Sequence, residues 1–343
     1  MKVDNKLISK STEVQEFKPT HVNSTEVRRI IKFGNSSHVI SVPHSWIKEN
    51  GLKKGDLIYL EKNSNGELVL MPKERKADIK EEKVNIDVED KDDKVIEREI
   101  IAAYIKGFTK LSITSNNIRK KLQPIEKVLK NLVGIEIFEK NSHEIIAADF
   151  LDVGNISIRD TIRRMDIYMR AMFEDLTECL ENKKITQEKF NEIYETDYDI
   201  NKLYFLLWRI AVLSLNNPSL LQKFKINSVE LIHTWWLSMN LEHIGDELKR
   251  IARDCKEKKL KNDTIKKFLN VLYTVKEAYL DVMKAYHKEN VGLAYEITSK
   301  KHDVIKKCDE LAKNDVKSVN INEKLKAVQS YVHNIAKCII YFT

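Results

Sequence analysis

The sequence predicts a multidomain protein with an all-β N-terminal segment, a small α/β middle segment and an all-α C-terminal bundle of six helices. The chain has 343 residues, about twice the length of one ordinary domain. Four glycines lie between residues 34 and 66, whereas two glycines and one proline follow Gly154. Turns are therefore expected early in the chain, and long uninterrupted helices late in it.

Composition indicates a core-forming chain without a membrane span. Charged residues make up 32% and hydrophobic residues 42%, and no run reaches the ~18 apolar residues of a spanning helix. The net charge of +7 is modest, and more than half of it falls within residues 27–56. The four cysteines form no CxxC pair, which fits a reducing cytoplasm and argues against a disulfide framework or a cysteine zinc site.

The first domain is predicted over residues 27–72, after a polar leader, 1–26, that we expect to be disordered. Its elements are expected in the order strand 27–32, strand 39–42, helix 44–50 opened by Pro43, and a hairpin of strands 56–61 and 67–71 around Asn65-Gly66. A unit of ~46 residues buries too little core to stand alone. We therefore expect it to pair or interleave with a second copy of itself.

The middle domain is predicted over residues 73–150. A charged linker leads into alternating strand and helix patterns in the order βαβαββ, with the second helix expected from residue 116 to about 133. The segment TSNNIRKK lacks the glycines of a phosphate-binding loop, so we expect no such loop here.

The C-terminal domain is predicted over residues 151–343. An apolar stripe at helical spacing, which includes Met165, Met169 and Met172, predicts a bundle helix over 156–182. We interpret these methionines as core filler, with a soft partner-binding groove as the alternative. Further helices are expected over 186–215, 227–258, 263–289, 291–313 and 321–342.

Two of these helices carry carboxylates one turn apart. Asp197 and Asn201 lie at the edge of the apolar stripe of the helix over 186–215, and Glu242 and Asp246 share one face of the next long helix. Oxygen ligands at this spacing suit a hard or borderline divalent ion. The alternative is a solvated face on which Glu242 and Asp246 pair with Lys249, Arg250 and Arg253.

Enzymatic patterns are lacking in the sequence. A di-iron bundle needs two Glu-x-x-His motifs, and the helices offer one, Glu230 with His233. There is no GxSxG motif, and no cysteine has a histidine at a meaningful spacing. The chain is therefore predicted not to be an enzyme.

The stretch RRIIKFGNSSHVISVPHSWIKENGLKKGDLIYLEKNSNGELVLMP resembles the AbrB/MazE/SpoVT swapped-hairpin family over its whole length. The resemblance implies two chains interleaved into one dimer that binds duplex DNA. The family's basic positions correspond to Arg28, Arg29 and Lys32, with Asn35 and Ser36 in the turn.

The helical region resembles PhoU, a phosphate-uptake regulator of two three-helix repeats whose acidic motifs bind metal ions. NLEHIGDELKRIA and DYDINKL carry this resemblance, which implies that Asp197, Asn201, Glu242 and Asp246 are metal ligands. The ion would be Mg, Mn, Fe or Ca. In the second repeat Lys326 and Ser330 occupy the ligand places of one motif and His302 and Lys306 those of the other, so we expect it to have kept the packing and lost most ligands.

The fusion of a swapped-hairpin segment, an α/β middle segment and a PhoU-like region is similar to archaeal phosphate-uptake regulators. The two resemblances imply a cytoplasmic DNA-binding regulator of phosphate uptake with a metal-binding sensor domain, acting as a homodimer. One alternative is an adaptor that docks on a phosphate ABC transporter ATPase or a histidine kinase without binding DNA, because Ser41 stands where the antitoxin branch often has arginine. The other is an antitoxin, against which the long folded sequence after residue 72 argues.

Overall fold

The computed structural model describes residues 26–62, 66–73, 82–182, 185–257, 261–314 and 318–342. The predicted leader lies outside the described residues except for Glu26, as does most of the predicted charged linker. The chain divides into two compact units, one within residues 1–59 and 70–74 and the other within residues 60–69 and 75–343. Among the described helices, none is both long and apolar enough to cross a membrane.

The N-terminal segment contains short strands and one short helix, as predicted. Its elements are β1 (Ile31–Phe33), β2 (Ser37–Val39), α1 (His44–Glu49), β3 (Tyr59–Lys62) and β4 (Leu68–Met71). β1 pairs antiparallel with β2 around Gly34, whose φ of 69° suits a glycine turn, and β3 pairs with β4. The strands predicted over 27–32 and 39–42 overlap β1 and β2 only in part, because the antiparallel register pairs Phe33 with Ser37 and Ile31 with Val39, directly on either side of the turn.

The middle segment is a four-stranded sheet with two helices, which confirms the predicted βαβαββ order. Its elements are β5 (Lys83–Asp87), α2 (Asp93–Lys106), β6 (Lys110–Thr114), a 3-10 turn (Ile118–Lys121), α3 (Leu122–Lys130), β7 (Ile135–Lys140) and β8 (Glu144–Asp149). The strand order is β5-β6-β8-β7, with β5 and β6 parallel. The 3-10 turn and α3 together replace the single helix predicted over 116–133.

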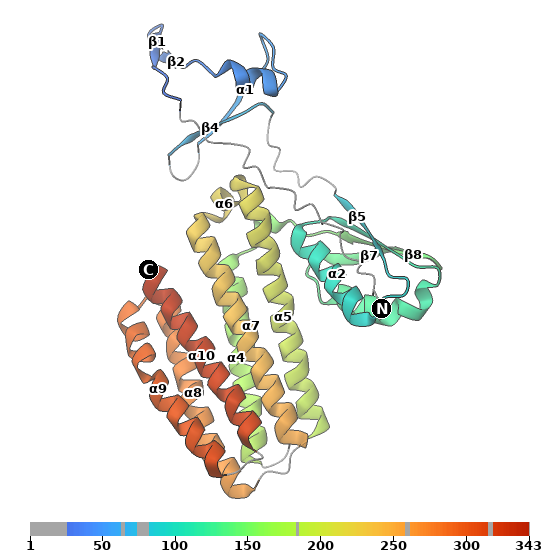
Figure 1. Ribbon diagram of the computed structural model, residues 1–343, viewed down its shortest axis with the longest axis vertical. Coiled ribbons are helices and arrows are strands. Elements are labelled where there is room, and N and C mark those ends of the chain that lie inside the picture. Colours follow the sequence, from blue (N-terminus) through green and yellow to red (C-terminus); the bar gives the residue numbers. More distant parts are fainter. Residues whose placement is uncertain are drawn as a thin grey trace, which may run out of the picture. The chain divides into compact units, whose positions relative to one another are not determined.

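The C-terminal region is helical (Figure 1). A 3-10 turn (Val153–Asn155) leads into α4 (Ile158–Glu181), α5 (Gln187–Asn216), α6 (Pro218–Phe224), α7 (Ser228–Glu257), α8 (Asn262–His287), α9 (Val291–Asn314) and α10 (Val319–Phe342). The six long helices match the six predicted ones. Met165, Met169 and Met172 are fully buried, so the methionine stripe is core filler.

One buried ion pair joins α5 to the α/β layer. Arg209 is 0% exposed, and its Nη2 lies 2.5 Å from Oδ2 of Asp149 at the end of β8. Its Nη1 donates to the backbone carbonyl of Tyr104 in α2. Gly107, which ends α2, lies against Leu213 of α5. A Cβ added to Gly107 would lie 2.5 Å from Cδ2 of Leu213. These contacts hold α5 against the sheet domain.

Candidate functional site

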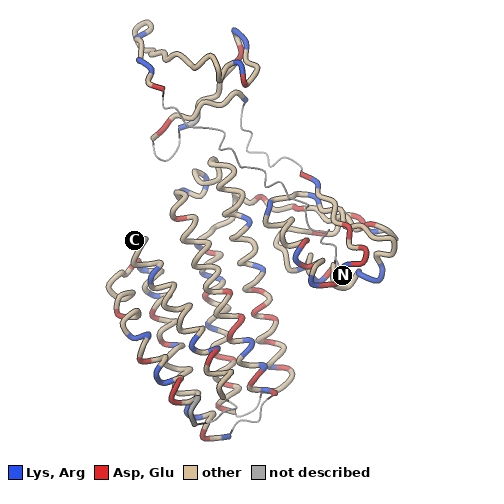
Figure 2. The backbone as a smooth tube through the Cα atoms, in the orientation of Figure 1, with Lys and Arg blue, Asp and Glu red and all other residues tan. Residues whose placement is uncertain are grey.

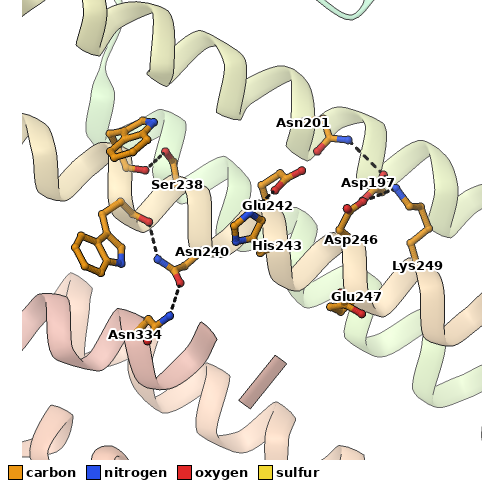
Figure 3. A network of polar contacts seen from close by, with 12 residues as sticks. Asp197, Asn201, Ser238, Asn240, Glu242, His243, Asp246, Glu247, Lys249 and Asn334 are labelled. Atoms are coloured by element: carbon orange, nitrogen blue, oxygen red, sulfur yellow. Dashed lines mark hydrogen bonds and ion pairs between the residues drawn. The ribbon is translucent and has the colours of Figure 1, made fainter. Parts of the chain in front are cut away.

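The structure brings the predicted acidic residues together between α5 and α7 (Figure 3). Asp197 lies on α5 and is 3% exposed, because it faces the neighbouring helix. Glu242 and Asp246 lie one turn apart on α7, with side chains 17% and 22% exposed. Asn201, one turn after Asp197, donates from Nδ2 to Oδ2 of Asp197 at 3.4 Å. Basic and acidic residues are interspersed along these helices (Figure 2).

Lys249 is the cation at the centre of this cluster. Its Nζ lies 2.5 Å from Oδ2 of Asp197 and 2.7 Å from Oδ1 of Asp246. Burial opposes the charge of Lys249, but the hydrogen bonds that it donates to both aspartates outweigh this effect and raise the pKa of Lys249. The lysine therefore links α5 to α7 as an ammonium ion.

Arg250 extends the network at the surface. It pairs with Asp246 at 2.6 Å and with Glu247 at 2.5 Å, whereas Arg253 is exposed. The predicted pairing of Asp246 with Lys249 and Arg250 is thus present.

Glu242 has a different environment. Within the described part of the chain it makes no ion pair with a lysine or arginine, and the imidazole of His243 lies 3.7 Å away. Burial, followed by the charges of Asp246 and Asp197, raises the pKa of Glu242 to about 7. Burial also lowers the pKa of His243, which keeps that ring a weak partner at neutral pH. Glu242 thus lies beside two aspartates without a direct ion pair to a described lysine or arginine, and the more distant charges of Lys249 and Arg250 offset only part of the rise in its pKa.

Two buried oxygens in this cluster lack a hydrogen-bond donor. They are Oδ1 of Asp197 and Oδ1 of Asn201, which are side-chain oxygens of the kind that hard divalent ions select. In the described residues, however, no three His, Cys, Asp or Glu side chains converge closely enough to hold a metal ion. The side-chain oxygens thus suit a divalent cation as ligands, but the ammonium group of Lys249 lies between Asp197 and Asp246.

The second helix trio lacks this arrangement, as expected from its sequence. Lys326 of α10 pairs with Asp309 of α9 and lies 2.7 Å from Glu323, and both carboxylates are about half exposed. The Ser330 hydroxyl donates to the carbonyl of Lys326, and His302 and Lys306 are exposed. The acidic cluster is therefore a feature of α5 and α7.

The predicted DNA-binding residues all lie at the surface of the N-terminal segment. Arg28 and Arg29 precede β1, Lys32 lies within it, and Asn35 and Ser36 form the turn to β2; each is exposed. Arg28 pairs with Glu26. These exposed positions are within reach of a partner such as a nucleic acid, which Arg28 would contact by giving up its exposed pair with Glu26.

Sequence reasoning missed Arg209 and its partner Asp149. Arg209 interrupts the apolar run LLWRIAV, and a single charge in such a run is a signal of a buried, paired side chain. Its partner could not be identified in the same way, because Asp149 is 60 residues away in the sequence.

Comparison with known families gives two matches. The model of the antidote-toxin recognition domain MazE, a bacterial antitoxin, matches residues 31–78, and the model of the PhoU domain matches residues 162–255. No curated protein matches the chain. The PhoU match runs from α4 to near the end of α7 and so includes the acidic cluster. The chain thus joins a MazE-type domain and a PhoU domain.

Proposed function

We propose that this protein regulates phosphate uptake, with the MazE-type domain binding duplex DNA and the PhoU domain responding to a divalent metal ion. The observation that carries the proposal is the presence of both domains in one chain. Both are regulatory rather than enzymatic domains. The PhoU domain connects the chain to phosphate homeostasis, and the MazE-type domain connects it to DNA binding or to an antitoxin role.

The exposed apolar residues of the N-terminal segment support a homodimer. Val27, Ile30, Phe33 and Leu57 are 91%, 70%, 69% and 73% exposed, and a second copy would remove their side chains from water. We expect light scattering of the full chain at micromolar concentration to show a dimer or a higher even oligomer. Phe33→Asp should shift that mass toward the monomer, and a monomeric wild-type protein would contradict this part of the proposal.

DNA binding would use Arg28, Arg29 and Lys32 as phosphate or base contacts. Each phosphate contact releases counterions, so affinity should fall steeply with salt concentration. The test is titration of the full chain with its own upstream DNA at several salt concentrations. Replacing Arg28 and Arg29 by alanine should weaken binding and flatten the salt dependence.

The matched control replaces Lys94 and Arg98 by alanine, since both are exposed on α2 and their loss removes the same charge elsewhere. If the variant that lacks Arg28 and Arg29 binds DNA as tightly as the wild type, the result would favour the adaptor that docks on a transporter ATPase or histidine kinase. The described helices that follow the MazE-type match make the chain much larger than that match, which argues against a simple antitoxin.

The metal ion would be held by Asp197, Asn201, Glu242 and Asp246. A divalent cation would offset the negative charge of Glu242. It would also contact Oδ1 of Asp197 and Oδ1 of Asn201, which have no hydrogen-bond donor among the described residues. We expect elemental analysis, after equilibration with manganese, iron, magnesium or calcium and removal of free metal, to find bound ion. Glu242→Gln with Asp246→Asn should abolish that binding while the helices stay folded.

The control for the metal test is Glu323→Gln with Asp309→Asn, which removes the same charge from the second helix trio. This variant should retain as much ion as the wild type. If the wild type binds none of these ions and its melting temperature does not respond to them, the acidic cluster is an ion-pair network only.

A further inference from the structure

A cavity lies at one end of the helical bundle. Its volume is ≈ 950 Å³, and it is bounded by the first turns of α4 and α7, by α6, and by the last turns of α8 and α10. It shares no residue with the acidic cluster between α5 and α7. Its size falls at the upper end of the range for small-molecule pockets, about 300–1,000 Å³, and far exceeds the needs of a single inorganic ion.

The inner wall of this cavity is apolar. Leu237 of α7 and Ile335 and Ile339 of α10 are at most 4% exposed and line it, with Phe224 and Tyr286 at its sides. Such a wall favours the apolar or aromatic body of a ligand over water.

The outer part of the cavity carries cations. Arg159, in the first turn of α4, is exposed and makes no ion pair with a described residue. Lys223 of α6 lies 3.7 Å from Asp152, but both side chains are largely exposed, so this pair is weak. The side chain of Lys223 packs over Gly154, and a Cβ added to this glycine would lie 2.5 Å from Nζ of Lys223. The end of the Lys223 side chain therefore lies against the backbone of Gly154 at the cavity.

Two acidic residues stand beside the two cations at the cavity. Glu230 and Glu289 also line it. The Glu230 carboxylate is engaged, because it accepts a hydrogen bond from the backbone N–H of Asn227 at 2.7 Å before α7. This hydrogen bond leaves the charge of Glu230 in place, so the cavity carries both signs, and Arg159 is a lining cation that has no ion pair with a described residue.

A buried network holds one wall residue in place. Asp166 of α4, 4% exposed, accepts hydrogen bonds from Tyr279 at 2.8 Å and from Arg170 at 3.0 and 3.1 Å. Its Oδ2 also lies 3.3 Å from Nε2 of His287, which lines the cavity. The imidazole is therefore oriented by a carboxylate behind it rather than free to rotate.

We infer that this cavity binds an organic anion whose apolar or aromatic body lies against Leu237, Ile335 and Ile339 and whose carboxylate or phosphate group meets Arg159 and Lys223. An acyl carboxylate and a nucleoside monophosphate share this chemistry. The inference is independent of the metal ion and of DNA binding.

The test is calorimetric titration of the full chain with decanoate, with adenosine monophosphate and with inorganic phosphate. At least one of the two organic anions should bind, and it should bind more tightly than inorganic phosphate. The anion that binds shows whether the ligand is an acyl carboxylate or a nucleoside monophosphate. Arg159→Gln should weaken that binding about tenfold, as expected for loss of a charged hydrogen-bond donor. Arg163→Gln, at an exposed arginine one turn further along α4 and outside the cavity, should bind like the wild type.

A second variant tests the cavity itself. Thr234→Trp places an indole in the space beside α7, and it should abolish binding while circular dichroism shows the helices intact. The inference is overturned if neither organic anion binds at millimolar concentration, if inorganic phosphate binds as tightly as they do, or if Arg159→Gln binds like the wild type. Should Thr234→Trp fail to fold, the comparison of Arg159→Gln with Arg163→Gln decides.

Discussion

Helices α7 and α10 share one packing pattern and differ in their polar chemistry. When LEHIGDELKRIA is aligned with LKAVQSYVHNIA, five apolar positions coincide, and all ten residues are at most 4% exposed. They are Leu241, Ile244, Leu248, Ile251 and Ala252 in α7, and Leu325, Val328, Val332, Ile335 and Ala336 in α10. The apolar spacing alone thus positions both helices in the core.

The polar positions between them are not equivalent. Glu242, Asp246 and Lys249 of α7 correspond to Lys326, Ser330 and His333 of α10. In α7 they join a largely buried cluster with Asp197, whereas Lys326 pairs with carboxylates about half exposed to water. Apolar packing thus determines where each helix lies, and the polar side chains between the apolar positions determine which charges it holds against its neighbours.

The largest expected effect on stability comes from replacing Lys249 of α7, and the corresponding comparison in α10 is the replacement of Lys326. Lys249→Met leaves Asp197 buried without its cation and should lower the free energy of unfolding by about 3 kcal/mol at pH 7. Lys326→Met removes pairs with exposed carboxylates and should cost less than about 1 kcal/mol. Urea unfolding of both variants measures the difference, and equal losses would show that the two networks are energetically alike.

Addition of Asp197→Asn to Lys249→Met should recover most of the loss, because residue 197 then carries no unpaired buried charge.

The next effect concerns the pH dependence of stability. The folded-state pKa of Glu242 is about 7, above its ordinary value of 4.5, so the folded protein holds this proton more strongly than the unfolded chain does. The metal-free protein should therefore lose stability as the pH rises from about 4.5 through 7. Glu242→Gln removes this loss and should raise the free energy of unfolding at pH 8 by about 2 kcal/mol, with little change at pH 4.

Thermal unfolding in the presence of a chelator measures this effect. Glu323→Gln in α10, whose side chain is 59% exposed, is the matched control and should leave the pH profile unchanged. A Glu242→Gln variant with the wild-type profile would mean that Glu242 titrates normally.

The smallest effect is expected at Gly245, where α10 has Gln329. A Cβ at Gly245 would lie 3.4 Å from Cδ1 of Ile200, 3.5 Å from Cε of Met169 and 3.6 Å from Oδ1 of Asp197, which are ordinary contacts. Gly245→Ala should therefore be tolerated, with a gain in helix propensity of up to about 1 kcal/mol. A loss of more than 1 kcal/mol on urea unfolding would show that the close approach of α5 to α7 requires glycine.

The sequence predicted the long helices well because each repeats its apolar spacing over many turns. It did not predict α6, since Pro218–Phe224 covers only seven residues and two turns establish no period. The apolar stripe places Asp197 at its edge, where a buried carboxylate needs a partner, and the structure provides Lys249 of α7 as that partner. The cavity could not be predicted, because residues from α4, α6, α7, α8 and α10 form it together.

The residues of α5 connect that helix to three other elements. Asp197 faces α7, the neighbouring Tyr198 donates from its hydroxyl to the carbonyl of Lys127 in α3 at 2.6 Å, and Arg209 pairs with Asp149 at the sheet. Twelve residues of helix, about 18 Å, separate Asp197 from Arg209. One continuous helix therefore makes direct contact with both the acidic cluster and the end of β8.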